Sequence, residues 1–585
     1  MNDTQHDIIV VGSGAGGAMA AYVLCKAGHK VLMLEAGRDY DPKTETPMFN
    51  TNAQAPLMGA GNKDKNFGFY DATVDGGWSV PDEPYTTGEG SDFFWWRSRM
   101  LGGRTNHWGR YSLRFSEHDF KGKSRDGHGA DWPFEYQDIA PWYDKTEELV
   151  GICGTNTGLD DMPDSPEGVL QPPPTPRIPE LLVAAAAKKH GIPLAPMHRA
   201  VLTRPKDDRL ACFYATPCGR GCSIGAAFQT TTSLIPMAQA TGNLKVITNA
   251  MVKTVDVDEN GRPSGITYIK KPSGQAHSIA ANQIILAASA CESARIMLNS
   301  LSKHHPKGLA NSSGQLGRNI MDSTGADLGA MIPALKGRPR YNEDGHTANH
   351  LFIPWWGHKA QANKELDFPR GYHFEIGSGF RMPGASVAGD LQGYGKALKQ
   401  NARDNYGTYI NLSLRGEMLP NPYCYMEIDD KVKDKWGIPV AKFHWQFSKH
   451  ELNQVAHGLQ TAKMLFETMG ASVKRLPSPE QAILKGGQII HEVGATRMGS
   501  SAKDSVTNQW GQTWDCDNLY VMDGGVFASN PHKNCTLTIM TLAMRNAAHL
   551  AERLSSEKNS SQSGAVSATT QSWCANSKGG THEIA

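Results

Sequence analysis

The sequence predicts an α/β (α+β) fold, in which a parallel-sheet domain is combined with a discontinuous second domain built on a large antiparallel sheet. Three observations lead to this prediction. A strand–turn–helix–strand pattern occupies residues 7–37, and a second strand–helix pattern occupies residues 283–300. Apolar and polar residues alternate, with frequent aromatic residues, over residues 326–450. Such alternation is typical of antiparallel strands that bury one face.

The first of these patterns contains a glycine-rich turn. The apolar run Ile8–Val11 predicts a buried strand, and Gly12, Gly14 and Gly17 follow it in the spacing G-x-G-x-x-G. The first glycine permits a sharp bend, the second lets the backbone approach a pyrophosphate, and the third lets helix and strand pack closely. Glu35 ends the second strand, where a carboxylate can accept a ribose hydroxyl. The stretch therefore predicts a Rossmann-like dinucleotide site, without distinguishing NAD from FAD.

Length and charge limit the class of protein. The chain has 585 residues, enough for more than one domain. Its 59 lysine and arginine residues balance 58 acidic residues, which argues against a nucleic-acid partner. No apolar run reaches the roughly 18 residues of a membrane span. The polar start MNDTQHD leads directly into the first strand, so we expect no signal peptide on this chain.

The remaining patterns place the domain boundaries. We expect helices at 136–150, 180–190, 229–239 and 449–469, and a final helix that ends at Leu554. Residues 244–275 predict a small antiparallel sheet with a turn at Asn260. The domain boundaries that we expect are 1–130, 225–325 and 490–555 for the parallel-sheet domain, 131–224 for a helical and loop insertion, 326–489 for the substrate domain, and 556–585 for a disordered tail.

An aromatic segment, Asp92–Phe115, follows the first domain pattern. It contains the glycine pair Gly102 and Gly103, and then Asn106 and His107. Such a turn indicates a backbone that bends closely around a planar ligand. The alternative is an aromatic core turn in which the histidine is simply hydrogen-bonded.

Three of the ten cysteines are clustered, at Cys212, Cys218 and Cys222. Glycine and proline residues surround them. Thiolates at such spacing can ligate an iron–sulfur cluster. A zinc ion would normally take a fourth ligand, and the segment contains no histidine. The alternative is that these are buried thiols in a loop, and the spacing leaves both interpretations open.

Taken together, these motifs resemble those of the GMC (glucose–methanol–choline) FAD-dependent oxidoreductases, along nearly the whole chain to about residue 555. The resemblance is strongest to flavoprotein subunits of bacterial sugar dehydrogenases, namely those for glucose, gluconate (2-), fructose and glucoside (3-). It implies FAD as the cofactor, with Glu35 on the adenosine ribose, the Val252 backbone against the adenine, and Asp523 beside the flavin and its ribityl chain. In pyranose oxidase and choline oxidase a histidine at the place of His107 carries the flavin covalently, so the resemblance leaves covalent and non-covalent FAD open.

The resemblance also implies the chemistry. His491, in HEVGATRMG, matches the catalytic histidine of the family, and Asn534, in NCTLTIMTLA, matches its partner. An imidazole with an ordinary pKa of about 6.5 is suited to take the proton of a substrate hydroxyl while the carbon hydrogen leaves as hydride to flavin N5. We therefore expect oxidation of a sugar or glycoside hydroxyl, such as C3 of a glucoside or C1 or C2 of glucose or gluconate. The alternatives are an H₂O₂-forming oxidase and a non-catalytic flavin electron-transfer subunit.

The dehydrogenase branch of this family carries cysteines at similar spacing to Cys212, Cys218 and Cys222, as ligands of a 3Fe-4S cluster. The resemblance thus implies electron transfer through a cluster to a cytochrome c. It also implies a small partner subunit that assists secretion, and hence a periplasmic location by co-export. A cytoplasmic location is the alternative.

Overall fold

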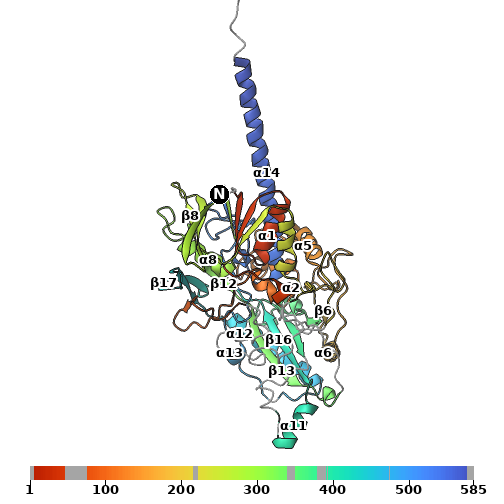
Figure 1. The fold of residues 1–585 in the computed structure, drawn as a ribbon. Coiled ribbons are helices and arrows are strands. Elements are labelled where there is room, and N and C mark those ends of the chain that lie inside the picture. Colours follow the sequence, from red (N-terminus) through yellow and green to blue (C-terminus); the bar gives the residue numbers. More distant parts are fainter. Residues whose placement is uncertain are drawn as a thin grey trace, which may run out of the picture.

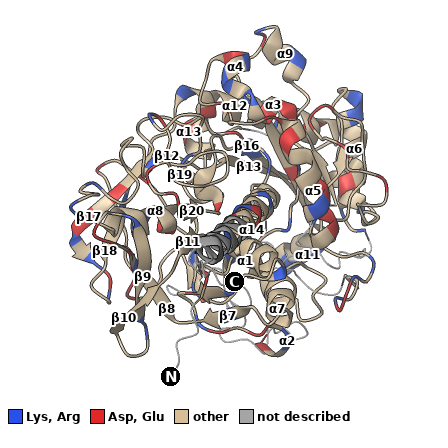
Figure 2. Cartoon of the chain, turned by 90° about the horizontal axis from the view of Figure 1, so that it is seen from above, with Lys and Arg blue, Asp and Glu red and all other residues tan. Residues whose placement is uncertain are grey.

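The computed structural model describes residues 6–45, 75–214, 222–338, 350–378, 391, 393–473 and 475–575. Two sheet-containing halves meet along the middle of the molecule (Figure 1). The parallel sheet lies in the half from which helix α14 (Thr536–Ala575) projects, and the large antiparallel sheet lies in the other half. Acidic and basic residues are interspersed around the surface (Figure 2), in keeping with the balanced composition.

The parallel sheet confirms the predicted Rossmann-like domain. All its neighbouring strands run parallel. In spatial order the strands are β20 (Leu519–Val521), β11 (Gln283–Leu286), β1 (Ile8–Val11), β2 (Val31–Leu34) and β7 (Leu244–Ile247). The glycine-rich turn leads from β1 into α1 (Ala15–Lys26).

Both faces of this sheet are covered, which explains why its strands are uninterrupted apolar runs. Ile8 and Val10 of β1 face a core shared with α1, α14 and α7 (Leu234–Ala240). Ile9 and Val11 face the opposite core, formed with α8 (Ala290–Asn299) and an antiparallel sheet. That sheet consists of β8 (Ala250–Val257), β9 (Pro263–Lys270) and β10 (Gln275–Ala280).

One sequence prediction is wrong in this region. Leu244–Ile247 does not belong to the antiparallel sheet expected over 244–275, because it pairs in parallel with β2. The chain changes direction at Asn249, which has a φ of +56°, and only then enters β8. Asparagine tolerates this left-handed conformation better than most residues.

The antiparallel sheet of the substrate domain joins segments from distant parts of the chain. Its spatial order is β13 (Thr324–Met331), β16 (Tyr409–Gly416), β15 (Tyr372–Ser378), β14 (Leu351–Ile353) and β6 (Ala195–Pro196). Helix α12 (Lys449–Thr468) packs on its apolar face. The region 326–450 does not form one sheet, because β17 (Tyr425–Lys433) pairs with β18 (Pro439–His444), and β18 pairs in turn with β4 (Thr86–Thr87), in a separate sheet.

The predicted helices are present, with one clear difference. Helix α5 (Tyr136–Val150) has the expected limits, and α6 spans Ile178–Lys189. Helix α14 does not end at Leu554 but continues to Ala575, into the segment predicted as a disordered tail. Once a helix is nucleated, each added residue gains a backbone hydrogen bond, so weak helix formers can extend it. Residues 576–585 lie outside the described residues.

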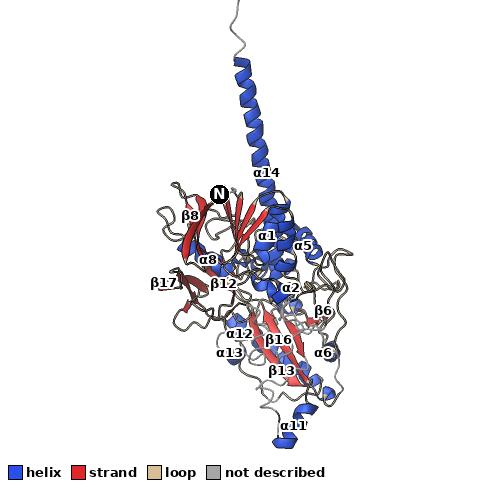
Figure 3. Ribbon diagram, viewed as in Figure 1, coloured by secondary structure: helices blue, strands red, loops and turns tan. Residues whose placement is uncertain are grey.

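Shorter elements connect these parts (Figure 3). Within the part of the chain that the structure describes, no helix has the length and hydropathy that a bilayer crossing requires. The shorter elements are α2 (Pro42–Glu45), β3 (Gly76–Gly77), β5 (Arg97–Ser98), α3 (Glu117–Phe120), α4 (Gly122–Asp126), β12 (Arg318–Met321), α9 (His358–Ala362), α11 (Gly395–Asp404), α13 (Pro479–Ala482), β19 (Val493–Ala495) and the 3₁₀ turns η4 (Gly103–Asn106), η6 (Thr230–Thr232), η7 (Pro333–Leu335) and η8 (Gly524–Val526).

Candidate active site

A cavity of about 320 Å³ brings together segments from both ends of the chain. It runs from the glycine-rich turn, past the aromatic segment, to the loop before β19 and the start of α14. The predicted site residues that line it are Gly12, Gly14, Glu35, Gly103, His107, Val252, His491, Asp523 and Asn534. Gly17 and Asn106 are not among the residues that line the cavity. Residues separated by more than 500 positions in the sequence therefore share one space.

The glycines of the first turn differ in what surrounds them. Gly12 has a φ of +102°, a conformation that side chains rarely adopt. A Cβ atom on Gly17 would lie 2.1 Å from the carbonyl oxygen of Gly12, so Gly17 allows α1 to pack against β1. A Cβ atom on Gly14 would meet nothing within 4 Å, because Gly14 faces the cavity. An anion can therefore approach the backbone at Gly14 and the start of α1.

Glu35 is buried beside this turn. Its carboxylate accepts hydrogen bonds from the backbone N–H of Ser13, at 3.1 Å, and of Gly37, at 2.7 Å. The Ser13 hydroxyl also donates to it. The carboxylate thus holds the turn in shape while it lines the cavity with Val252, the residue expected at the adenine.

His107 lies within the aromatic segment, directly after η4. Its Nε2 accepts a hydrogen bond from the indole N–H of Trp96, at 2.9 Å, which places the ring proton on Nδ1. Nδ1 has no hydrogen-bond partner among the described residues. Burial, together with the charges of Arg110 and Arg104, lowers the pKa of His107 to about 3, so the ring is neutral. Asn106 instead donates to the carbonyl of Leu101, at 2.8 Å, and shapes the turn from behind.

His491 and Asn534 lie side by side. The Asn534 amide nitrogen is 3.4 Å from His491 Nε2 and 3.4 Å from a carboxylate oxygen of Glu375. Because the amide donates to Nε2, the ring proton of His491 lies on Nδ1, which is 2.9 Å from the Ser323 hydroxyl. Burial lowers the pKa of His491 to about 3, although the nearby Glu375 opposes the shift. The imidazole is therefore neutral, and its Nε2 lone pair faces the Asn534 amide.

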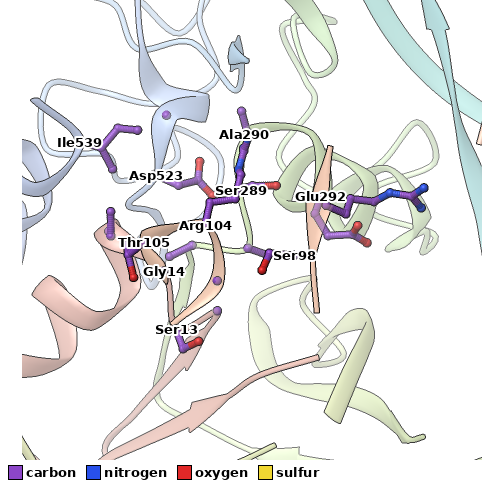
Figure 4. A pocket seen from close by; sticks show the side chains of 18 of the residues that line it. Ser13, Gly14, Ser98, Arg104, Thr105, Ser289, Ala290, Glu292, Asp523 and Ile539 are labelled. Carbon is purple, nitrogen blue, oxygen red and sulfur yellow. The ribbon is translucent and has the colours of Figure 1, made fainter. Parts of the chain in front are cut away.

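Asp523 provides a carboxylate on the same cavity wall. It accepts hydrogen bonds from the Ser293 hydroxyl, at 2.6 Å, and from the Gly525 N–H, at 2.8 Å. Burial raises the pKa of Asp523 to about 6. Figure 4 shows Asp523 and Ser289 on the same side of the cavity, with Gly14 and Ser13 toward the other end.

Two residues that no sequence motif identified, Ser323 and Glu375, contact His491 and Asn534 respectively. Ser323 lies between β12 and β13, and Glu375 lies on β15. Burial would raise the pKa of Glu375, but Arg415, 3.7 Å away, lowers it to about 2, so the group is ionised. A signal was present: β15 alternates apolar Tyr372, Phe374 and Ile376 with His373 and Glu375, and all five are buried.

Cys212 and Cys222, the described members of the cysteine cluster, are not among the residues that line this cavity. Cys218 lies outside the described residues. The sulfur atoms of Cys212 and Cys222 each accept a backbone N–H, from Tyr214 and Ala227, both at 3.4 Å. Within the described ranges, no three potential ligands come close enough together to hold a metal ion.

The cavity residues fit an FAD molecule. Gly14 opens the backbone where a pyrophosphate would lie, and Glu35 and Val252 line that end. At the other end, Nδ1 of His107 and Oδ1 of Asn534 are buried without hydrogen-bond partners in the described chain, and both residues line the cavity. Fold and site together define an FAD-dependent oxidoreductase that acts on CH–OH groups.

Comparison with known proteins agrees. Profiles of the family described as GMC oxidoreductase match residues 6–324 with the N-terminal domain and residues 420–543 with the C-terminal domain. The chain belongs to the GMC oxidoreductase family.

Individual relatives span almost the whole chain. A 2-methyl-1,2-propanediol dehydrogenase of Mycolicibacterium austroafricanum is 29% identical over 94% of this chain and 96% of its own length. The large subunit of a fructose dehydrogenase of Gluconobacter japonicus is 26% identical over 93% of this chain and 98% of its own length. The solved structure of a formate oxidase of Aspergillus oryzae has a TM-score of 0.64 at 13% identity, over 95% of this chain and 100% of that chain. This structural likeness shows the shared fold.

Proposed function

We propose that this protein is an FAD-dependent dehydrogenase that oxidises a hydroxyl group of a sugar, a glycoside or a small polyol, with His491 as the base. The observation that supports it most directly is that the neutral His491 and Asn534 line the same cavity as the glycine-rich turn. The relatives that act on fructose and on 2-methyl-1,2-propanediol favour polyhydroxylated substrates. Within this class, the substrate groups that we favour are a secondary hydroxyl of a pyranose, such as C3 of a glucoside, and the hydroxyl at C1 or C2 of glucose or gluconate.

The roles of the residues follow from their contacts. Nε2 of His491 accepts the hydroxyl proton, while the bond to Ser323 fixes the ring orientation. When substrate binds, the Asn534 amide exchanges its contact with His491 Nε2 for the substrate oxygen, which frees Nε2 to act as the base and stabilises the developing negative charge on that oxygen. FAD, when bound, accepts the hydrogen of the carbinol carbon with its electron pair. His107, on the same cavity, remains neutral and is the candidate for a covalent bond to the cofactor.

The electron acceptor is a separate part of the proposal. Cys212, Cys218 and Cys222 would hold a 3Fe-4S cluster that passes electrons to a cytochrome c. The N–H···S bonds at Cys212 and Cys222 are of the kind that tune cluster thiolates. Because the fructose relative is a large subunit, we extend the proposal to a small partner subunit and to periplasmic co-export. Iron analysis tests the cluster: the wild type should contain iron and Cys218→Ser should lose it, whereas an iron-free, fully active wild type would exclude it.

The experiment that tests the activity is an anaerobic screen of glucose, gluconate, fructose, glucosides and 2-methyl-1,2-propanediol that follows flavin bleaching. We expect bleaching by at least one of them, and a loss of turnover of about 10²–10⁴-fold in His491→Ala with the flavin retained. The control is His450→Gln. His450 lies on α12, buried against the carbonyl of Glu417, and is not among the residues that line the cavity. Stoichiometric peroxide in air would instead indicate an oxidase, and full turnover in His491→Ala would refute the role of the base.

A further inference from the structure

We propose that a chain of buried imidazoles and carboxylates carries the proton taken from the substrate from His491 to the protein surface. This inference rests on the proposed function. In each turnover the alcohol would give a hydrogen with its electron pair to FAD and a proton to His491, and a carbonyl would form. His491 is buried and must lose that proton before it can act again. The members of this proton relay, in order from the active site, are Glu375, His373, His532, Asp161 and His358.

Consecutive members of the relay are in contact. His373 Nε2 lies 3.7 Å from Glu375 Oε1, and His373 Nδ1 lies 3.4 Å from His532 Nδ1. His532 Nε2 lies 3.2 Å from Asp161 Oδ2. Asp161 Oδ1 in turn lies 3.3 Å from His358 Nε2. The relay therefore connects β15, the loop before α14, the loop at Asp161 and the start of α9.

The relay begins in the core and ends at solvent. The side chains of His373 and His532 are 0% and 3% exposed, whereas that of His358 is 26% exposed. The ring of His358 also stacks on that of His118, with centroids 4.3 Å apart. A proton that reaches His358 can therefore pass to bulk water.

Each of the two central imidazoles faces successive members of the relay with its two ring nitrogens. His373 Nε2, 3.7 Å from Glu375, is beyond hydrogen-bond distance and has no hydrogen-bond partner in the described chain, so it must close this gap before it can pass a proton. Three contacts need a proton: from His373 to Glu375, between the two rings, and from His532 to Asp161. Two neutral rings supply only two protons, so one contact always lacks a proton, and the position of this defect can move between the ends. A third proton that enters beside Glu375 fills it, and another then leaves at Asp161. Burial lowers the pKa of both rings, so both are neutral at rest and able to accept.

The surrounding charge favours passage of a cation. Lys533 is buried between Asp119 and Asp161, at 2.7 Å and 2.9 Å, which leaves one net negative charge beside His532. That charge lowers the cost of a transient imidazolium at His532. Near the active site, Glu375 is paired with Arg415 and remains ionised, so it can accept a proton.

The first transfer, from His491 to Glu375, takes place around Asn534. The Asn534 amide nitrogen is 3.4 Å from both His491 Nε2 and Glu375 Oε1, so the two groups are at most twice that distance apart. One water molecule that donates to Asn534 Oδ1, an atom without another partner among the described residues, would complete the path.

The test uses the holoenzyme with whichever of fructose and 2-methyl-1,2-propanediol bleaches its flavin. The variants are His373→Gln and His532→Gln, which keep hydrogen-bonding capacity but cannot take up a proton near neutral pH. His450→Gln is the matched control. We expect normal flavin content and a normal rate of first-turnover bleaching, with kcat lowered at least about tenfold. The solvent isotope effect on kcat should rise, and added imidazole should restore kcat.

A purely structural role for these histidines would change protein folding, flavin content or first-turnover bleaching, and imidazole would not rescue it. If both variants turn over like His450→Gln, or lose kcat without imidazole rescue, the relay is refuted while the proposed function stands. If neither alcohol, nor any other in the screen, bleaches the wild-type flavin, the proposed function fails and the relay fails with it.

Discussion

Gly14 and Gly17 of the glycine-rich turn provide a test that separates folding from cofactor binding. A Cβ atom on Gly17 would lie 2.1 Å from the Gly12 carbonyl oxygen and 3.2 Å from the Ala287 side chain. Helix α1 would have to move by roughly 1 Å or more to restore van der Waals distance. Gly14→Ala meets no such obstacle, because nothing lies within 4 Å of its Cβ position.

Overpacking of this kind costs about 1–3 kcal/mol, and a backbone contact that cannot rotate away belongs at the upper end. We therefore expect Gly17→Ala to lower the Tm of the FAD-free protein by roughly 2–5 °C. Gly14→Ala should leave that Tm within about 1 °C and weaken FAD binding by roughly 10–100-fold, because its methyl group occupies the place of the pyrophosphate.

Thermal unfolding followed by circular dichroism, and FAD titration followed by fluorescence quenching, measure the two effects separately. Equal destabilisation by the two substitutions would refute the packing role of Gly17. Unchanged FAD affinity in Gly14→Ala would refute the position assigned to the pyrophosphate.

Two further predictions concern His491, the proposed base. Ser323→Ala removes the 2.9 Å contact with His491 Nδ1 and should lower kcat about tenfold, the equivalent of about 1.4 kcal/mol, with flavin content unchanged; an unaltered kcat would show that this contact does not orient the ring. Because the pKa of His491 is lowered to about 3, the base is neutral above that pH, and its protonation should reduce kcat/KM only well below pH 5. A pH profile with a His491-dependent limb near 6.5 would contradict this, and Asp523→Asn identifies any limb near 6 that arises from Asp523, whose pKa is about 6.

The parallel-sheet domain was predictable because its signals are local. The strand Ile8–Val11 has the predicted limits, since apolar runs between turns identify buried strands. Alternation over 244–275 did not show which sheet Leu244–Ile247 joins, since the choice depends on pairing with β2, more than 200 residues away. The continuation of α14 to Ala575 was missed because composition does not record propagation from an existing helix.

The site was predictable only where a short motif carried it. The glycine-rich turn, Glu35, His491 and Asn534 were identified from motifs, and the structure places them on one cavity. Ser323 was not identified, because its contact with His491 joins residues 168 positions apart. Covalent attachment through His107 and the cluster at Cys212 stay predictions.

The sequence by itself therefore determined the parts of this protein: a strand–turn–helix unit shaped for a dinucleotide, and residue types suited to remove a proton from a hydroxyl. Glycine spacing and apolar periodicity act over a few residues, so they can be read along the chain. Only the tertiary structure decided that Glu375, His373 and His532 lie next to one another beside Asn534 and His491. The physical reason is that burial and proximity, which set protonation and hydrogen bonding, arise when β15 and the start of α14 pack together.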